Sequence, residues 1–435
     1  MPLVIVQYSL ILKQFADTLI VSRLGGEALA AIGPASLMTS LLMAFGLGIM
    51  GGLTTVVGQA HGGGDLEQTG KATWQGIWLG LGLGLLMLSF GPSDRMVFGE
   101  FFNHSAAVYA MEVEYFRWSL FGLAPEFVAD AIAVFFIATG RPVVPMIVAG
   151  IGVALNPVLS AALVFGWLGL AELGIRGAAI GSACSAVIQV VILLAIFLGR
   201  DYRRGYGTGK PAIRLENWKR LFKIGIPAGL QEAVDLASWG ILLIWLIGRF
   251  GDAHLAAATV LFRCMQLSFL PADGIGISLS AQVANDVGSR RFRVARARVR
   301  IVTAIAAGYM AMVGVLMVLF RGPIFALFTG NDQIMAIGVA AILFVAAFQV
   351  FDAINIVYVN ALQGVGDTFW PLIVNGFLTI LILLGGGLFV VHQFPQWESV
   401  GVWGVATLYI LFQAVAFRWR WRSGRWAVLV PDQPT

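Results

Sequence analysis

Charged residues are scarce in this sequence. Asp, Glu, Lys and Arg make up 12% of its 435 residues, and hydrophobic residues make up 59%. A typical soluble domain has about 25% charged and about 45–50% apolar residues. The shortage of charge excludes a soluble globular protein and indicates an integral membrane protein.

Cysteine and histidine are also rare, with two and four copies. Cys184 and Cys264 fall inside hydrophobic runs, where they read as small apolar fillers rather than a disulfide or a metal pair. The histidines lie near the ends of such runs or between them, which argues against a haem or other metal-based membrane enzyme. We expect neither enzymatic activity nor a bound cofactor.

Long hydrophobic runs are what the sequence has instead. A helix of about 20 mainly apolar residues crosses a hydrocarbon core of about 30 Å. The short alternating pattern of a membrane barrel is absent, so we interpret the runs as helices. Twelve candidate spans lie at residues 2–22, 28–60, 70–91, 111–139, 143–166, 175–199, 221–248, 255–285, 299–320, 333–362, 370–393 and 400–418.

The basic residues are unevenly divided between the two sides of these spans. With the N-terminus inside, twenty of the 28 Lys and Arg residues fall on the inner side, five on the outer side, and Lys13, Arg117 and Arg263 within spans. This bias predicts a multi-pass protein of the cell inner (plasma) membrane with both termini in the cytoplasm. We interpret the basic loops as anchors that contact membrane lipids, not nucleic acid, and we expect a monomer.

The sequence also repeats itself. A shift of 226 residues aligns Arg23 with Arg249, Gly25 with Gly251, Leu29-Ala30-Ala31 with Leu255-Ala256-Ala257, Gly48 with Gly274, Gly62 with Gly288 and Pro145 with Pro371. Six spans per copy is an even number, so both copies enter the membrane from the same side. The predicted fold is all-α, with twelve transmembrane helices in two parallel six-helix repeats around a central cleft.

We expect four segments: an N-terminal lobe at residues 1–200, a cytoplasmic linker at 201–220, a C-terminal lobe at 221–420 and a cytoplasmic tail at 421–435. Glycines between Gly205 and Gly209 favour a flexible linker over a phosphate-binding loop, since no strand precedes them. We interpret Met1–Ser22 as a retained helix, not a signal peptide. The first copy has no counterpart of residues 218–226, so either the start is late or this run is absent.

One carboxylate lies deep inside a span. Asp352 occurs in the apolar run Phe348–Asn360. A charge at the centre of a membrane helix costs about 2.5–3.5 kcal/mol on insertion scales, and those that remain usually take part in ion or proton traffic. Asp352 is therefore a candidate functional residue.

Four stretches carry distinctive motifs: residues 15–25 with 28–31, residues 156–160 with 165–166 and 174–179, residues 225–231, and residues 348–353 with 361–368. Together they resemble the multidrug and toxic compound extrusion (MATE) transporters across nearly the whole chain. The resemblance implies two six-helix lobes, export by rocking between outward- and inward-facing states, and coupling to a Na⁺ or H⁺ gradient through acidic residues.

In the N-terminal lobe, Asp17 matches the acidic residue of the family. The resemblance implies that an Asn, an Asp four residues later and a Thr complete this site; here Asn156 fits, whereas Ser160 and Ser182 replace the other two. Hard cations prefer several oxygen ligands with negative charge, so the loss of a carboxylate weakens the case for Na⁺. Lys13 lies one turn before Asp17, and Asp17 is either a proton carrier or half of a structural ion pair.

In the C-terminal lobe, Asp235 stands where the resemblance implies a Glu, and Glu232 lies three residues earlier on the same helical face. Together with Asp352 they form a predicted acidic cluster. Like charges in a low-dielectric site resist joint ionisation, so these groups are expected to bind and release protons near neutrality, or to hold Na⁺ at Asp235 and Asp352. The alternative is that Arg263 neutralises one of them.

Further acids are open to interpretation. Glu126 falls opposite the carboxylate of the tenth span under the 226-residue shift, and Asp130 follows one turn later. A structural pairing with Arg117 and a role in transport are both possible interpretations. We expect Glu112 and Glu114 to lie on a solvated face.

Four aromatic residues lie on the carboxylate-bearing helices and could stack on a flat lipophilic cation: Trp239, Phe348, Phe351 and Tyr358. For any one of them, lipid contact or core packing is the favoured interpretation.

The leading functional hypothesis is an antiporter that exports lipophilic, often cationic compounds in exchange for H⁺ or Na⁺. The alternative is a flippase for a lipid-linked saccharide, which would need more Lys and Arg in its spans than Lys13, Arg117 and Arg263. A membrane enzyme would need a His cluster, a Ser–His pair or a cytoplasmic catalytic domain.

Overall fold

The computed structural model describes residues 2–102, 104–211 and 215–429, and these residues form helices without a β-strand. Twelve helices in this part of the chain are long and apolar enough to cross a membrane, which confirms the predicted spans. The long helices are α1 (Pro2–Val21), α2 (Gly26–Gly62), α3 (Leu66–Leu88), α4 (Ala106–Ala138), α5 (Val143–Phe165), α6 (Ile175–Phe197), α8 (Leu215–Gly240), α9 (Asp252–Gly288), α10 (Phe292–Leu319), α12 (Asp332–Val365), α13 (Phe369–Leu378) and α15 (Glu398–Arg422). Short helices are α7 (Arg200–Tyr206), α11 (Arg321–Ala326) and α14 (Gly387–Gln393).

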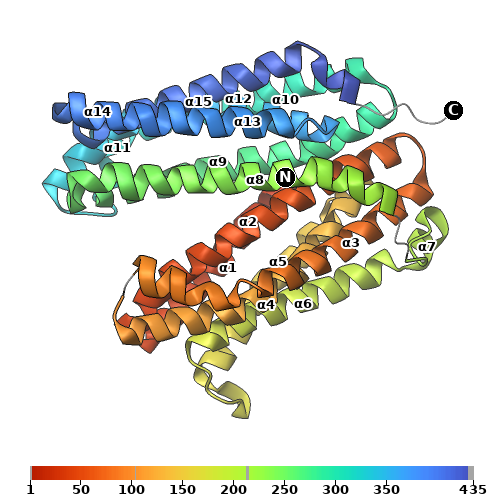
Figure 1. The fold of residues 1–435 in the computed structure, drawn as a ribbon, viewed down its shortest axis with the longest axis horizontal. Coiled ribbons are helices and arrows are strands. Elements are labelled where there is room, and N and C mark those ends of the chain that lie inside the picture. Colours follow the sequence, from red (N-terminus) through yellow and green to blue (C-terminus); the bar gives the residue numbers. More distant parts are fainter. Residues whose placement is uncertain (1, 103, 212–214, 430–435) are drawn as a thin grey trace. The chain divides into compact units, whose positions relative to one another are not determined.

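The chain divides into two compact units, Met1–Gly229 and Leu230–Thr435, and within each unit the long helices run side by side (Figure 1). Helix starts recur 226 residues apart. α2, α3, α4 and α5 begin at residues 26, 66, 106 and 143, and their counterparts α9, α10, α12 and α13 begin at residues 252, 292, 332 and 369. The structure therefore confirms two copies of one six-helix unit.

The turns before α2 and α9 use the same backbone conformation. Gly25 has φ 122° and ψ 176°, and Gly251 has φ 98° and ψ 177°. Residues with a Cβ rarely adopt such positive φ values, whereas glycine adopts them without steric cost. The repeated glycine is thus a structural requirement of the second helix in both copies.

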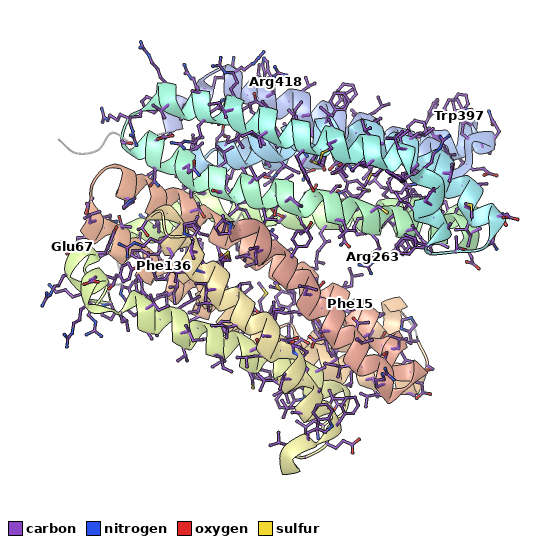
Figure 2. The ribbon with its side chains drawn as sticks, turned by 180° about the vertical axis from the view of Figure 1, so that it is seen from behind. Phe15, Glu67, Phe136, Arg263, Trp397 and Arg418 are labelled. Atoms are coloured by element: carbon purple, nitrogen blue, oxygen red, sulfur yellow. The ribbon has the colours of Figure 1, made fainter. Side chains whose placement is uncertain are left out.

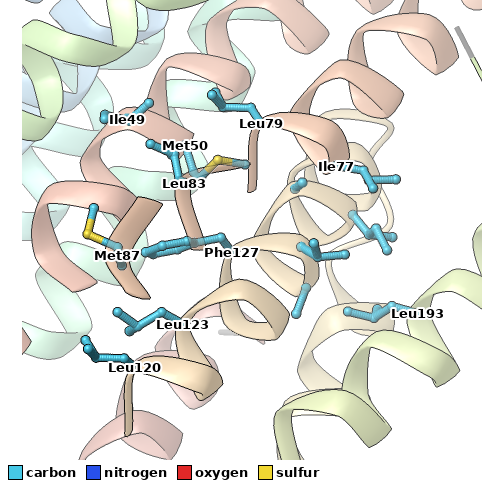
Figure 3. Close-up of a cluster of buried hydrophobic side chains, with 14 of the residues drawn as sticks. Ile49, Met50, Ile77, Leu79, Leu83, Met87, Leu120, Leu123, Phe127 and Leu193 are labelled. Atoms are coloured by element: carbon cyan, nitrogen blue, oxygen red, sulfur yellow. The ribbon is translucent and has the colours of Figure 1, made fainter. Parts of the chain in front are cut away.

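Large apolar side chains and glycines together form the core of the first unit. Phe127 of α4 packs among Met50, Leu83 and Leu123 from α2, α3 and α4 (Figure 3). A Cβ on Gly46 of α2 would lie 2.1 Å from the Phe127 ring. Close approach at small residues gives van der Waals contact, which membrane helices need because lipid offers no hydrophobic driving force between them.

The start of the expected flexible linker is instead helical and docked on the first unit. The Trp74 indole donates to the Thr208 carbonyl at 2.7 Å, and the Thr208 hydroxyl is buried. Arg141 donates to the Tyr202 hydroxyl at 2.5 Å, and this hydrogen bond raises the pKa of the guanidinium. The flexibility prediction for Gly205–Gly209 is wrong, because aromatic packing and these hydrogen bonds hold the segment.

The first residues of the predicted cytoplasmic tail, 421–435, pack against the second unit. Trp426 is fully buried and stacks on Trp421, with the two ring centroids 4.7 Å apart. Residues 430–435 lie outside the described part of the chain.

The second unit contains two π-helical segments inside its spans, Ile241–Leu246 after α8 and Thr379–Gly386 between α13 and α14. Such wider turns often occur at functional sites. Both segments follow polar residues that belong to the site described below.

Candidate functional site

In the first unit, three helices bring polar groups together around Asp17 of α1. Ser160 of α5 donates to one carboxylate oxygen at 2.9 Å, and Ser182 of α6 donates to the other at 2.6 Å. Asn156 donates to the Ser182 hydroxyl at 2.6 Å. The predicted set Asp17, Asn156 and Ser182 is therefore adjacent in space, and Ser160 occupies a position against the carboxylate.

This site is closed and incompletely hydrogen-bonded. Asp17 is 5% exposed, whereas Asn156 and Ser160 are fully buried. The Oδ1 atom of Asn156 is buried without a hydrogen-bond partner among the described residues. A buried acceptor without a donor costs about 1–3 kcal/mol, so this oxygen is a ready acceptor for a proton donor or a cation.

Lys13 forms its ion pair with Glu126 of α4, across 2.6 Å, and not with Asp17. The direct Lys13–Asp17 pair is therefore not formed, although Lys13 still acts on Asp17 electrostatically. Arg117 pairs with Asp94 at 2.5 Å and not with Glu126. The i,i+4 spacing suggested a local partner for Lys13, and a long-range carboxylate takes its place.

The prediction of a solvated face for Glu112 is wrong. Glu112 is fully buried, and His104 Nδ1 lies 2.7 Å from its Oε1 atom. Glu114 is half-buried, with 40% of its side chain exposed, and Arg176 lies 3.5 Å from it. Residues two apart on a helix point in different directions, so the two acids could not both share one environment.

The second unit holds the larger group of acids. Glu232 and Asp235 lie on α8, Asp273 on α9 and Asp352 on α12, and electrostatic interactions link Glu232 to Asp235 and Asp273, and Asp352 to the same two residues. Glu232 is exposed, and Asp235 and Asp352 are half-buried. Asp273 is an addition to the set predicted from the sequence.

The alternative that Arg263 neutralises one of the predicted acids is wrong for the described part of the chain. Arg263 is exposed (Figure 2) and donates to Gln266, one turn along the same helix, at 3.1 Å. Its guanidinium therefore has a partner on its own helix.

A network of amides and hydroxyls lies near the acids. Asn375 of α13 interacts with Asp235, and its Oδ1 atom accepts from the Tyr409 hydroxyl at 2.6 Å and from Gln413 Nε2 at 2.7 Å. Asn355, three residues after Asp352 on α12, donates to Gln413 Oε1 at 3.2 Å. The amides of Asn375, Gln413 and Asn355 thus form one hydrogen-bonded chain.

A side branch of the network reaches the second π-helical segment, Thr379–Gly386. Thr379, its first residue, lies 3.2 Å from the Tyr409 hydroxyl and 3.0 Å from Ser238. Sequence reasoning missed these residues. A polar residue alone inside an apolar span was the signal that could have found Asn375, Gln413 and Thr379.

Comparison with known proteins gives the family. A model of the MatE family matches residues 2–162 and 232–386. The chain belongs to the MatE family. It is 27% identical over 432 residues to a probable multidrug resistance protein NorM of Aromatoleum aromaticum, covering 96% of this chain and 91% of the relative. A NorM of Thermotoga maritima is 25% identical over 415 residues, covering 94% of this chain and 88% of the relative.

Solved structures have the same fold as this MatE family member. The MATE transporter VcmN of Vibrio cholerae superposes with a TM-score of 0.88 at 19% identity, covering 98% of this chain and 96% of the other. A MOP superfamily transporter of Pyrococcus furiosus gives 0.86 at 21% identity, covering 99% and 95%. Family and fold are those of transporters, not of enzymes.

The aromatic residues predicted to line a substrate path in this MatE family member differ in exposure. Phe348 and Tyr358 are buried in packed clusters. Trp239 and Phe351 are half-buried, and the Trp239 ring lies 6.4 Å from that of Phe348. The lining role remains a prediction for all four residues.

Neither unit of the described chain offers a dense set of metal ligands. No group of three or more His, Cys, Asp or Glu side chains that could hold a metal ion occurs among the described residues. Around Asp17 the ligands are one carboxylate and neutral oxygens, and a hard cation prefers more negative charge.

Proposed function

We propose that this MatE family member is a secondary active antiporter that exports lipophilic, often cationic small molecules in exchange for H⁺. The names of its relatives, probable multidrug resistance proteins, support export of small-molecule drugs. Its twelve apolar helices support placement in the cell membrane. Both termini in the cytoplasm, a monomeric state and contact with membrane lipids remain predictions.

The acidic cluster of the second unit carries the proposal. Glu232 and Asp352 each interact electrostatically with Asp235 and Asp273. Like charges at such a site resist joint ionisation. Binding of H⁺ or of a cationic substrate reduces this repulsion and therefore lowers the free energy of the cluster. Competition between the two for the same negative charge is the physical basis of exchange.

The donor chemistry supports H⁺ over Na⁺ as the coupling ion. Asp17 has two serine hydroxyls as partners where Na⁺ binding would favour a second carboxylate. A single carboxyl group suffices to carry one proton. Na⁺ at Asp235 and Asp352 is the competing assignment, and it makes a different experimental prediction.

The coupling ion can be tested in proteoliposomes that contain the full chain. Efflux of a fluorescent lipophilic cation is followed under an imposed pH gradient with no Na⁺ present. We expect transport that stops when a protonophore removes the gradient. Absence of transport under these conditions, with recovery under a Na⁺ gradient, would overturn the assignment of H⁺.

The role of the cluster can be tested with Asp352→Asn. We expect this variant to abolish ion-driven efflux while expression is unchanged, because the amide has nearly the same shape but cannot exchange a proton. Asp332→Asn is a matched control, since Asp332 is exposed in the first turn of the same helix. Unchanged transport by Asp352→Asn would remove Asp352 from the mechanism.

A lipid-linked saccharide flippase is the alternative, and the charges disfavour it. Of the three cations predicted to lie within spans, Lys13 and Arg117 are paired with carboxylates. Only Arg263 is left to contact a pyrophosphate. A cationic site for that group would need several such residues.

A further inference from the structure

The two copies of the repeat differ at a position that carries a cation in the first unit. Under the 226-residue shift, Glu126 of α4 corresponds to Asp352 of α12, so both copies have a carboxylate at this point. The same shift places Lys13 of α1 opposite Trp239 of α8. An ammonium group in the first copy is therefore replaced by an indole ring in the second.

In the first unit the cation and the carboxylate are in direct contact. Lys13 Nζ donates to Glu126 Oε1 at 2.6 Å, and the exposed fractions of the two side chains are 12% and 20%. Lys13 is covalently part of α1, so this cation cannot exchange with the surroundings. The protein itself neutralises the charge of Glu126, which then has little attraction for a cation from outside.

In the second unit the corresponding position holds an aromatic ring beside the carboxylate-bearing helix. The Trp239 ring lies 6.4 Å from the ring of Phe348, which precedes Asp352 by one turn of α12. Trp239 and Asp352 are both half-buried, so each keeps some exposed surface. The face of an indole ring attracts a cation but brings no charge of its own. The place of the ammonium group is thus left to a separate molecule.

The exchange of lysine for tryptophan also changes which cation suits the position. A lysine ammonium is a compact, strongly hydrated point charge. Aromatic side chains instead recognise quaternary cations, whose charge lies on a larger apolar body. A carboxylate with an indole nearby therefore suits a bulky lipophilic cation better than a small hydrated one.

We propose that the Lys13 ammonium is a built-in substitute for the cationic substrate in the first unit, which leaves one cation site per chain, at Asp352 and the face of Trp239. This inference rests on the proposed function, in which the substrate is a cation. The substitute is always present in the first unit, so only the second unit exchanges its cation with the surroundings.

The experiment counts the cations bound to the purified full chain by equilibrium binding of tetraphenylphosphonium, a permanent lipophilic cation. We expect one bound ion per wild-type chain. Lys13→Met keeps an unbranched side chain but removes the charge, and we expect it to bind two ions. Addition of Glu126→Gln to Lys13→Met should return the count to one. A count of one for Lys13→Met alone would overturn the proposal.

The reverse exchange tests the proposal without disturbing the first unit, so it remains decisive if Lys13→Met fails to fold. Trp239→Lys attaches an ammonium group to the chain near Asp352, and we expect it to abolish binding of the probe. Trp239→Met removes the ring without adding a charge and should weaken binding by only about tenfold. Equal binding by Trp239→Lys and the wild type would overturn the proposal.

Trp245→Lys is the matched control for the reverse exchange. Trp245 is exposed, and the Arg249 guanidinium lies 4.3 Å from the centre of its ring. This variant makes the same change of ring for ammonium close by on the chain, and we expect it to bind the probe as the wild type does. Loss of binding in this control as large as in Trp239→Lys would also overturn the proposal.

Failure of the proposed function gives a different result from failure of this inference. If the wild type neither binds nor exports tetraphenylphosphonium, the proposed export of lipophilic cations fails. If the wild type binds one ion and Lys13→Met also binds one, only the role of Lys13 fails. Two ions per wild-type chain would mean that the first unit is open despite Lys13, which also overturns the inference.

Discussion

Lys13 of α1 donates to Glu126 of α4 across 2.6 Å, so the ammonium group of the first helix is paired with a carboxylate other than Asp17. Both partners are largely buried, with side-chain exposures of 12% and 20%. The pair joins two helices of the first unit. Asp17 is left with hydroxyl groups as its direct partners.

The Lys13–Glu126 pair should contribute to stability. Removal of one partner from a buried ion pair costs about 3–5 kcal/mol, and the residual exposure places Lys13→Met and Glu126→Gln at or below the lower end of that range. The double variant should lose less than the sum of the two. Unfolding midpoints in detergent measure this cycle; additive losses would show that the pair contributes nothing.

Asp17→Asn should lose ion-driven efflux while retaining the fold. The amide oxygen can still accept from one serine, but the group can no longer exchange a proton. Ser160→Ala and Ser182→Ala each remove one hydrogen bond to the carboxylate and should reduce transport to a smaller extent. Efflux of a fluorescent cation from everted vesicles measures all three, and normal transport by Asp17→Asn would exclude the N-terminal site from coupling.

The turn glycines of the two copies should respond alike to substitution. Gly25→Ala and Gly251→Ala place a Cβ at φ 122° and 98°, where no other atom lies within 4 Å. Backbone strain is then the only penalty, at about 1–3 kcal/mol each. Gly26→Ala and Gly248→Ala are controls with ordinary φ and equally open space. A drop in unfolding midpoint for the controls as large as for the turn variants would contradict this account.

Addition of one methyl group at Gly70 should detach the segment that follows α6, residues 200–211, from the first unit. A Cβ on Gly70 would lie 2.1 Å from the Tyr206 carbonyl oxygen, whereas a Cβ on Gly82 of the same helix meets nothing within 4 Å. We expect Gly70→Ala to make residues 200–211 sensitive to protease in inside-out vesicles. Gly82→Ala should remain resistant, and equal cleavage of both variants would mean that this contact does not hold the segment.

The helix count and the repeat could be predicted from the sequence, because both depend on local residue patterns and not on tertiary contacts. Runs of apolar residues fix the spans, and Gly25 with Gly251 fixes the offset of 226 between the copies. Asp17, Asn156 and Ser182 were matched through the family resemblance, and the fold brings them together.

Side-chain contacts that depend on tertiary packing could not be predicted from the sequence. Glu112 is an ordinary acid in the sequence, and only the orientation of α4 determines that it is buried against His104. Asn375 and Gln413 have no spacing that links them, since α13 and α15 bring them together through packing. Single polar residues inside spans were the only available signal, and that signal names no partner.

The constant offset of the helix starts has a practical consequence. From Gly26 to Val143, and from Asp252 to Phe369, each long helix together with the connection that follows it spans the same number of residues in the two halves. Their chemistry has diverged, with a serine-bound carboxylate in one half and a group of acids in the other. Length in this interval is therefore more constrained than side-chain identity, and reporter peptides are better inserted outside it than into its loops.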